Sequence, residues 1–131
     1  MTQSIATIAL VVHDYDEAIA FYRDRLGFSL IADTPLGSKR WVLVGPPGGG
    51  ARLLLAQADG EAQAARVGDQ TGGRVGFFLE TEDFDRDHAA FAAAGVRFRE
   101  APRDEAYGKV AVFEDLYGNA WDLIEPAGNG D

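Results

Sequence analysis

The chain has 131 residues, with 21 acidic and 12 basic side chains and a formal net charge of −9. This length suits one compact domain, or two half-size modules that share a sheet. The acidic excess argues against nucleic acid as a partner, because phosphate binding requires clustered lysine and arginine. The absence of cysteine excludes disulfides, thiolate metal ligands and cysteine nucleophiles.

Nothing in the sequence indicates a membrane protein. The longest apolar stretches, such as Ile8–Val12 and Leu53–Ala56, are far shorter than the roughly 20 residues that span a bilayer. The sequence also shows no charged-then-apolar leader. We therefore expect a cytoplasmic protein with no membrane partner.

The first half of the chain predicts one strand, one helix and three further strands. Ser4–Val12 is rich in β-branched residues and predicts the first strand. Asp14, followed three residues later by Glu17, has the form of a capping box and predicts a helix behind it. Gly27 stands where a left-handed residue would close that helix. Three further strands are expected at Phe28–Ala32, Arg40–Val44 and Ala51–Gln57. A connector with one or two helical turns is expected at Asp59–Gln70.

The second half repeats this order. Arg74–Leu79 predicts a strand and Asp83–Ala94 predicts a helix, which Gly95 closes as Gly27 closes the first. The remaining strands are expected at Val96–Arg99, Val110–Phe113 and Ala120–Glu125.

This internal repeat is the most informative pattern in the sequence. IALVVHDYDEAIAFYRDRLGFSL aligns with VGFFLETEDFDRDHAAFAAAGVRF. It predicts an α+β fold of two βαβββ modules, at about residues 4–57 and 72–126, joined by a connector at about residues 58–71 within a single domain of residues 1–131. A helix on one face of each sheet leaves the other face free. Strand alternation gives that free face the smaller and more polar residues, as expected for the lining of a cavity.

Two segments, IALVVHDYDEAIAFYRDRLGF and YGKVAVFEDLYGNAWDLIEP, resemble the vicinal oxygen chelate superfamily. That superfamily includes glyoxalase I, extradiol dioxygenases, fosfomycin-resistance enzymes and bleomycin-resistance proteins. The resemblance covers roughly Ile5 to Pro126 and implies the glyoxalase/bleomycin-resistance-like fold, with curved mixed sheets around a cavity and usually a homodimer. Fold alone does not establish function, so the site needs its own argument.

In the metal-dependent members, His, Glu or Gln at four strand positions binds a divalent cation. The resemblance, combined with the repeat, places those positions at Thr7, Leu54, Arg74 and Asp122. Only Asp122 is a competent ligand, because a hydroxyl, an alkyl chain and a guanidinium cannot replace imidazole or carboxylate. Arg74 would also add a fixed positive charge where the metal should lie. We therefore expect no metal and no other cofactor.

Arg74 and Asp122 are both expected on the cavity face, and two interpretations stay open. They form a mutual ion pair, or Arg74 binds a carboxylate, phosphate or enolate of a ligand while Asp122 orients the guanidinium. Trp41, Phe78 and Tyr107 are candidates for the wall of the pocket. Sheet packing or a dimer contact explains these aromatic residues equally well.

The leading hypothesis is a homodimeric, metal-free protein that binds a small organic molecule, as bleomycin-resistance proteins do. The alternative is an enzyme, either a glyoxalase-type lyase or isomerase or a dioxygenase-like protein with a non-standard site. Its metal set would be Asp122 with Glu80, His13 or Glu114. Without a metal, Asp122 would act as a base while Arg74 stabilises an enolate. A dimeric scaffold without chemistry is a third class.

Overall fold

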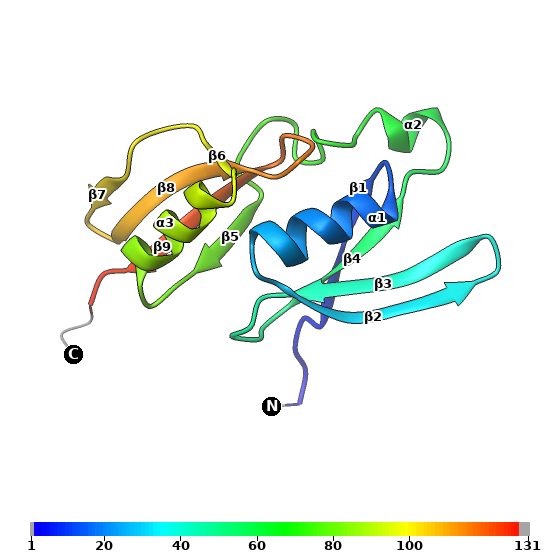
Figure 1. The fold of residues 1–131 in the computed structure, drawn as a ribbon, viewed down its shortest axis with the longest axis horizontal. Helices are drawn as coiled ribbons and strands as arrows, with labels where there is room; N and C mark the ends of the chain where they lie inside the picture. Colours follow the sequence, from blue (N-terminus) through cyan, green and yellow to red (C-terminus); the bar gives the residue numbers. More distant parts are fainter. Residues whose placement is uncertain (1, 129–131) are drawn as a thin grey trace. The chain divides into compact units, whose positions relative to one another are not determined.

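The computed structural model describes residues 2–128, which form two compact units that divide between Gln70 and Thr71. Each unit has its own sheet and its own helix on one face of that sheet (Figure 1). The two units are described in turn.

The first unit is a four-stranded mixed sheet with a helix. Its elements are β1 (Thr7–Val12), α1 (Tyr15–Ile19), the π-helical turns η1 (Ala20–Arg25), β2 (Ser29–Leu36), β3 (Lys39–Gly45), β4 (Arg52–Gln57) and α2 (Glu61–Ala64). The strand order is β1-β4-β3-β2, in which β1 runs parallel to β4 and the other neighbours are antiparallel. The backbone N–H of Glu17 donates to Asp14 Oδ2 at 2.8 Å, which confirms the predicted cap.

Alternation along β1 separates the two faces of this sheet. Leu10 and Val12 are fully buried under α1 and η1, whereas Thr7 and Val11, which point the other way, are only half-buried. The core between helix and sheet consists of Leu10, Val12, Tyr15, Ala18, Ile19, Phe21, Tyr22, Leu26, Val42, Val44, Leu53 and Leu55. Burial of these side chains is the main force that holds the helix to the sheet.

The end of the connector is hydrogen-bonded to the outer edge of β1. The backbone N–H of Val11 donates to Gln70 Oε1, and Gln70 Nε2 donates to the carbonyl of Ala9, both at 2.9 Å. The side-chain amide of Gln70 therefore satisfies backbone groups that the edge of a sheet would otherwise leave unpaired.

The second unit repeats the plan with one addition. Its elements are β5 (Phe77–Glu80), α3 (Phe84–Ala93), β6 (Arg97–Phe98), β7 (Arg103–Glu105), β8 (Gly108–Glu114) and β9 (Ala120–Pro126). The strand order is β5-β9-β8-β6, β7 also pairs with β8, and β5 runs parallel to β9. The short strand β7 was not predicted, because its sequence, Arg-Asp-Glu, has none of the apolar alternation that signals a strand.

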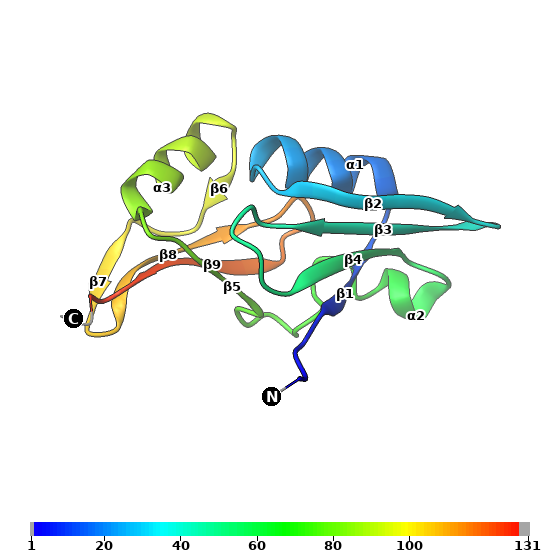
Figure 2. The same ribbon diagram turned by 90° about the horizontal axis from the view of Figure 1, so that it is seen from below.

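Aromatic rings fill the core between α3 and its sheet. The ring of Trp121 stacks on Phe77 at 4.8 Å and on Phe113 at 5.7 Å, measured between centroids. Phe113 also meets Phe91 of α3 edge-on at 5.3 Å and Phe98 at 5.8 Å. α3 lies on one side of the sheet in both views (Figures 1 and 2). Phe113 is thus the centre of the hydrophobic core of this unit.

The α+β class and the repeated module plan are confirmed by this architecture. Gly27 and Gly95, which were expected to close the two helices, have positive φ values of 77° and 90°. Among residues 2–128, none of the helices combines the length and the apolar character needed to cross a bilayer.

Candidate functional site

The side of each sheet that faces away from its helix is the candidate surface for function, and we call it the open face of that unit. In the first unit it carries Thr7 and Leu54, both half-buried, and Trp41, whose side chain is 42% exposed. Leu54 pairs with Ala9 on β1 and with Leu43 on β3, so it lies in the middle of the sheet. This face is mainly apolar, and its polar groups include the Thr7 hydroxyl and the guanidinium of Arg52, which is exposed and pairs with Thr7 in the sheet.

The open face of the second unit carries a carboxyl group beside an exposed ring. Asp122 on β9 pairs with Phe78 on β5 and with Val112 on β8. Residues paired in this way point to the same side of a sheet. Phe78 is 64% exposed, which is unusual for a large apolar side chain, whereas Asp122 is half-buried. The structure therefore brings two of the predicted site residues together.

Asp122 has a buried oxygen atom that is left without a partner. Its Oδ1 is inaccessible to solvent and accepts no hydrogen bond from any residue that the structure describes. Burial raises the pKa of Asp122 above its usual range; the Arg103 guanidinium lowers it again and the Glu100 carboxylate adds to the increase. An unsatisfied buried acceptor costs free energy, so the ionised form of Asp122 is destabilised at this position.

The charges beside Asp122 belong to a cluster around Arg103. Arg103 Nε donates to Glu100 Oε2 at 3.0 Å and its NH1 donates to Glu105 Oε2 at 2.5 Å. Hydrogen bonds to Glu100, to Tyr107 and to Glu105, in that order of size, raise the pKa of Arg103. Tyr107, which is 54% exposed in the turn between β7 and β8, therefore belongs to this cluster.

Sequence reasoning missed both Arg103 and Glu100. Glu100 Oε2 also accepts from the backbone N–H of Val112 at 3.0 Å, which holds its carboxylate against β8. No motif marks either residue. Only the pairing of β7 with β8, which sets Arg103 opposite Val110, places them on the same side of the sheet as Asp122.

Arg74 does not have the position that was expected of it. It is exposed and precedes β5, which begins only at Phe77, because Gly72 and Gly73 have positive φ and Thr71 Oγ1 donates to the carbonyl of Arg74 at 2.5 Å. These features turn the chain before the strand starts. No ion pair found within residues 2–128 joins Arg74 to Asp122.

The helix caps identify the true counterpart of Thr7 in the repeat. Thr7 lies seven residues before the cap Asp14, and Gly76 lies seven residues before the cap Asp83. The equivalence of Thr7 with Arg74 is therefore wrong by two residues. The spacing from strand to cap is the same in both modules, so the residue that corresponds to Thr7 is Gly76.

A divalent metal does not fit the four equivalent positions. Thr7 supplies a hydroxyl, Leu54 an alkyl chain and Gly76 no side chain, so Asp122 is the one strong ligand among them. A Cβ atom added to Gly76 would collide with the side chain of Thr71. The space in which a metal-binding side chain would begin is therefore filled.

The alternative metal set is not assembled either. Within residues 2–128, no three His, Asp or Glu side chains gather in a group that could hold a metal ion. Glu114, one of the residues expected for this set, instead accepts from Arg99 Nε at 2.7 Å.

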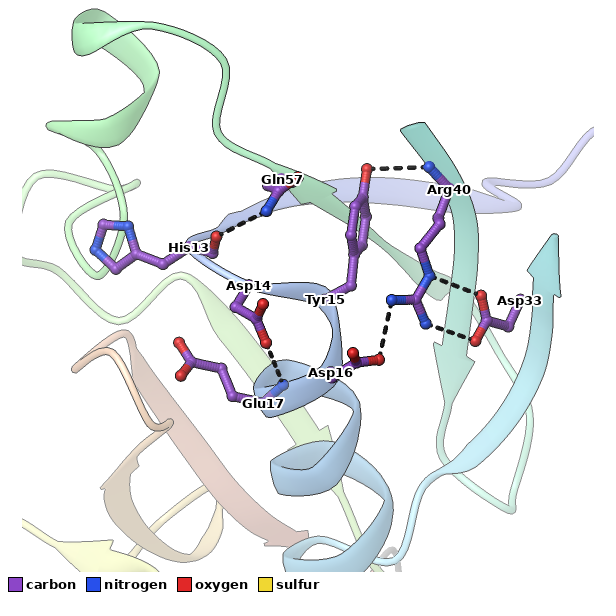
Figure 3. Close-up of polar contacts among 8 residues, drawn as sticks. All are labelled: His13, Asp14, Tyr15, Asp16, Glu17, Asp33, Arg40 and Gln57. Carbon is purple, nitrogen blue, oxygen red and sulfur yellow. Dashed lines mark hydrogen bonds and ion pairs between the residues drawn. The ribbon is translucent and has the colours of Figure 1, made fainter. Parts of the chain in front are cut away.

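A second group of charged residues lies at the start of α1 (Figure 3). Arg40 donates to both carboxylate oxygens of Asp33, at 3.1 and 2.8 Å, and pairs with Asp16 at 2.9 Å. Its backbone N–H donates to the Tyr15 hydroxyl at 3.2 Å. The ring of His13 points away from these contacts (Figure 3). The group therefore joins β2, β3 and α1, and its polar atoms are already engaged with one another.

The first testable consequence concerns stability. Asp122→Asn should raise the free energy of unfolding by about 1 kcal/mol at pH 8. A carboxyl whose pKa is raised by folding stabilises the protein below its unfolded pKa and loses that contribution as pH rises through its folded pKa. The gain should therefore be largest at pH 8 and smaller at pH 4.

Urea unfolding followed by tryptophan fluorescence at pH 4, 6 and 8 measures this difference. Asp104→Asn, which removes the charge of an exposed carboxylate on β7, is the matched control and should change stability little at each pH. A loss of stability in Asp122→Asn at pH 8 would contradict the assignment of an unsatisfied carboxyl.

Two repeated modules, each with a helix on one face of a mixed sheet and an open face opposite, define a class of paired βαβββ proteins. The family model of the Glyoxalase/Bleomycin resistance protein/Dioxygenase superfamily matches residues 4–123, and the chain belongs to this superfamily. The resemblance identified from the sequence is thereby confirmed.

Individual proteins are also similar to this chain. An uncharacterized protein of Shewanella frigidimarina (strain NCIMB 400) is 54% identical over 128 residues, which cover 95% of each chain. The crystal structure of UcmS2 is similar with a TM-score of 0.82 and 29% identity, covering 95% of this chain and 99% of that one. TnmS3, an antibiotic binding protein from Streptomyces sp. CB03234, is similar with a TM-score of 0.79 and 30% identity, covering 97% and 99%.

Proposed function

We propose that the protein binds a small organic molecule on the open faces of its sheets, without a metal ion. The observation that carries this proposal is the pair formed by Phe78 and Asp122. An exposed aromatic ring lies beside a carboxyl group whose buried oxygen lacks a hydrogen-bond partner. Apolar walls with a few convergent polar groups are typical of small-molecule sites.

The first unit supplies the same type of surface. Its open face presents the exposed indole of Trp41 and the half-buried Leu54, with the Thr7 hydroxyl and the Arg52 guanidinium as polar groups. The similarity to TnmS3, an antibiotic binding protein, supports an organic ligand rather than an ion.

We propose a site without a metal ion because the residues at the superfamily's metal-ligand positions are poor metal ligands. Thr7, Leu54 and Gly76 offer no imidazole or carboxylate, and Thr71 fills the space next to Gly76. We further propose that the protein is a homodimer, as the superfamily resemblance implies, and that it is located in the cytoplasm.

Fluorescence titration with three planar tricyclic probes tests this function: 9-aminoacridine, acridone and anthracene-9-carboxylate. We expect at least one probe to bind, and Phe78→Ala to weaken its binding about tenfold, because a buried aromatic contact contributes on the order of 1 kcal/mol or more. Addition of EDTA should leave the affinity unchanged.

Leu36→Ala is the matched control, since Leu36 is a comparably exposed apolar residue, 55% accessible, at the end of β2. It should bind each probe as the native protein does. If none of the probes binds, or if Phe78→Ala binds them as tightly as the native protein, this assignment of the site is wrong.

A further inference from the structure

We infer that the ligand is a flat aromatic acid whose anionic group pairs with the guanidinium of Arg52 on the open face of the first unit, an inference that rests on the proposed function. Three observations carry it. The guanidinium of Arg52 is unengaged, an apolar surface lies beside it, and the local charge of this face is positive.

The first observation is that the fold does not use the charge of Arg52. Its backbone N–H donates to the carbonyl of Ala6 at 2.9 Å, which fixes the start of β4 next to the start of β1. In the part of the chain that the structure describes, its guanidinium joins no ion pair and no side-chain hydrogen bond. The planar fork of N–H donors is therefore available to a carboxylate or phosphate group, which it binds through two parallel hydrogen bonds.

The second observation is the apolar surface beside this guanidinium. The register of β3 and β4 brings Gly45 next to Arg52. A Cβ atom added to Gly45 would lie 3.5 Å from Arg52 Cγ and 3.1 Å from Ile31 Cδ1. The stem of Arg52 and the side chain of Ile31 thus share the space that the glycine leaves, and both residues are exposed.

The same surface continues along β3 as far as Trp41. Trp41 and Gly45 are four residues apart, which is roughly 13 Å at about 3.3 Å per residue. Leu43 and its partner Leu54 lie between them on the same face. Fused aromatic rings can therefore cover the two leucines and contact the indole while an acidic substituent reaches Arg52.

The third observation is the positive charge of this face. Among the described strand residues that point to it, the charged ones are Arg52 and Lys39, which pairs with Leu36 next to the hairpin turn. The acidic residues of the first unit lie at the helical segment, on the helix side of β2 or in the connector: Asp14, Asp16, Glu17, Asp24, Asp33, Asp59, Glu61 and Asp69.

The connector adds little negative charge next to this face. Gln70, which contacts the edge of β1, is uncharged, and the carboxylate of Asp69 before it is paired with Arg66 at 3.9 Å. Although the whole chain has a formal net charge of −9, the local potential here favours an anion.

Anthracene-9-carboxylate and its uncharged amide, anthracene-9-carboxamide, test the inference because they share one ring system and differ in charge. In a fluorescence titration at pH 8 and low salt, we expect the native protein to bind the carboxylate at least fivefold more tightly than the amide. Added salt should reduce this preference, since it screens the attraction between the two charges.

Two matched variants show whether the preference comes from Arg52 itself. Arg52→Gln should weaken binding of the carboxylate at least fivefold and change binding of the amide less than twofold. Lys39→Gln removes the same charge from the same face, six residues from Gly45 on β3 or roughly 20 Å, and should leave both affinities within twofold of native. Arg52→Lys, which keeps the charge and loses the planar fork, should retain an intermediate affinity.

The outcomes distinguish this inference from the proposal on which it rests. If the amide binds as tightly as the carboxylate, if Arg52→Gln keeps full affinity for the carboxylate, or if Lys39→Gln loses as much, the inference is overturned and small-molecule binding stands. The same holds if 9-aminoacridine or acridone binds and the carboxylate does not. If no probe binds the native protein, both are overturned.

Discussion

Phe113→Ala should lower the free energy of unfolding of the second unit by about 3–5 kcal/mol. The Phe113 side chain is fully buried and its ring contacts Phe91, Phe98 and Trp121. Truncation removes this apolar surface and leaves a cavity that rings fixed on three sides cannot fill by relaxing. This loss is comparable with a large part of the stability of a small domain.

Urea unfolding followed by the fluorescence of Trp121 measures this loss, in a Trp41→Phe background so that one tryptophan reports on the second unit. Phe78→Ala is the matched control: it makes the same chemical change on the opposite face of the sheet, where the side chain is 64% exposed. It should alter stability by less than about 0.5 kcal/mol. Equal losses in the two variants would refute the assignment of the two faces.

Asp115→Ala should destabilise the same unit by about 3 kcal/mol. The carboxylate of Asp115 is buried in the turn between β8 and β9. Its Oδ1 accepts from the backbone N–H groups of Tyr117 and Asn119, both at 2.9 Å, and its Oδ2 accepts from Asn119 Nδ2 at 2.8 Å. Alanine leaves these donors without their acceptor in a place that water does not reach.

Asp104→Ala, the same truncation at an exposed position of β7, controls for the loss of a negative charge and should change stability by less than about 0.5 kcal/mol. Both variants are compared by urea unfolding at pH 7. Native-like stability in Asp115→Ala would show that the turn is held together by other contacts.

The buried turn also explains one of the motifs that suggested the superfamily. The segment from Phe113 to Asn119 contains the core ring, the turn carboxylate Asp115 and the amide that it accepts from. These residues are structural: they hold β9 against β8 and so determine where Asp122 lies on the open face. This part of the motif therefore specifies the scaffold of the candidate site.

The same distinction explains why the elements could be predicted and the site only in part. Helix caps such as Asp14 and Asp83 act over three residues, so the sequence shows them directly. The start of β5 depends on the glycine turn beside Thr71, and a shift of two residues there moved a predicted metal position from Gly76 to Arg74. Local alternation cannot detect such a shift, because it keeps every side chain on the same face.

Apart from β7, the order of the elements was determined by the sequence alone, as were the duplicated module and the helix on one face of each sheet. These features depend on periodicity and capping between near neighbours. Only the tertiary structure decided which charged groups meet. Glu100 reaches the backbone of Val112, and Arg103 reaches the vicinity of Asp122, through the pairing of β7 and β8. Strand pairing joins residues distant in the chain, so the unpartnered oxygen of Asp122 becomes visible only when the sheet is formed.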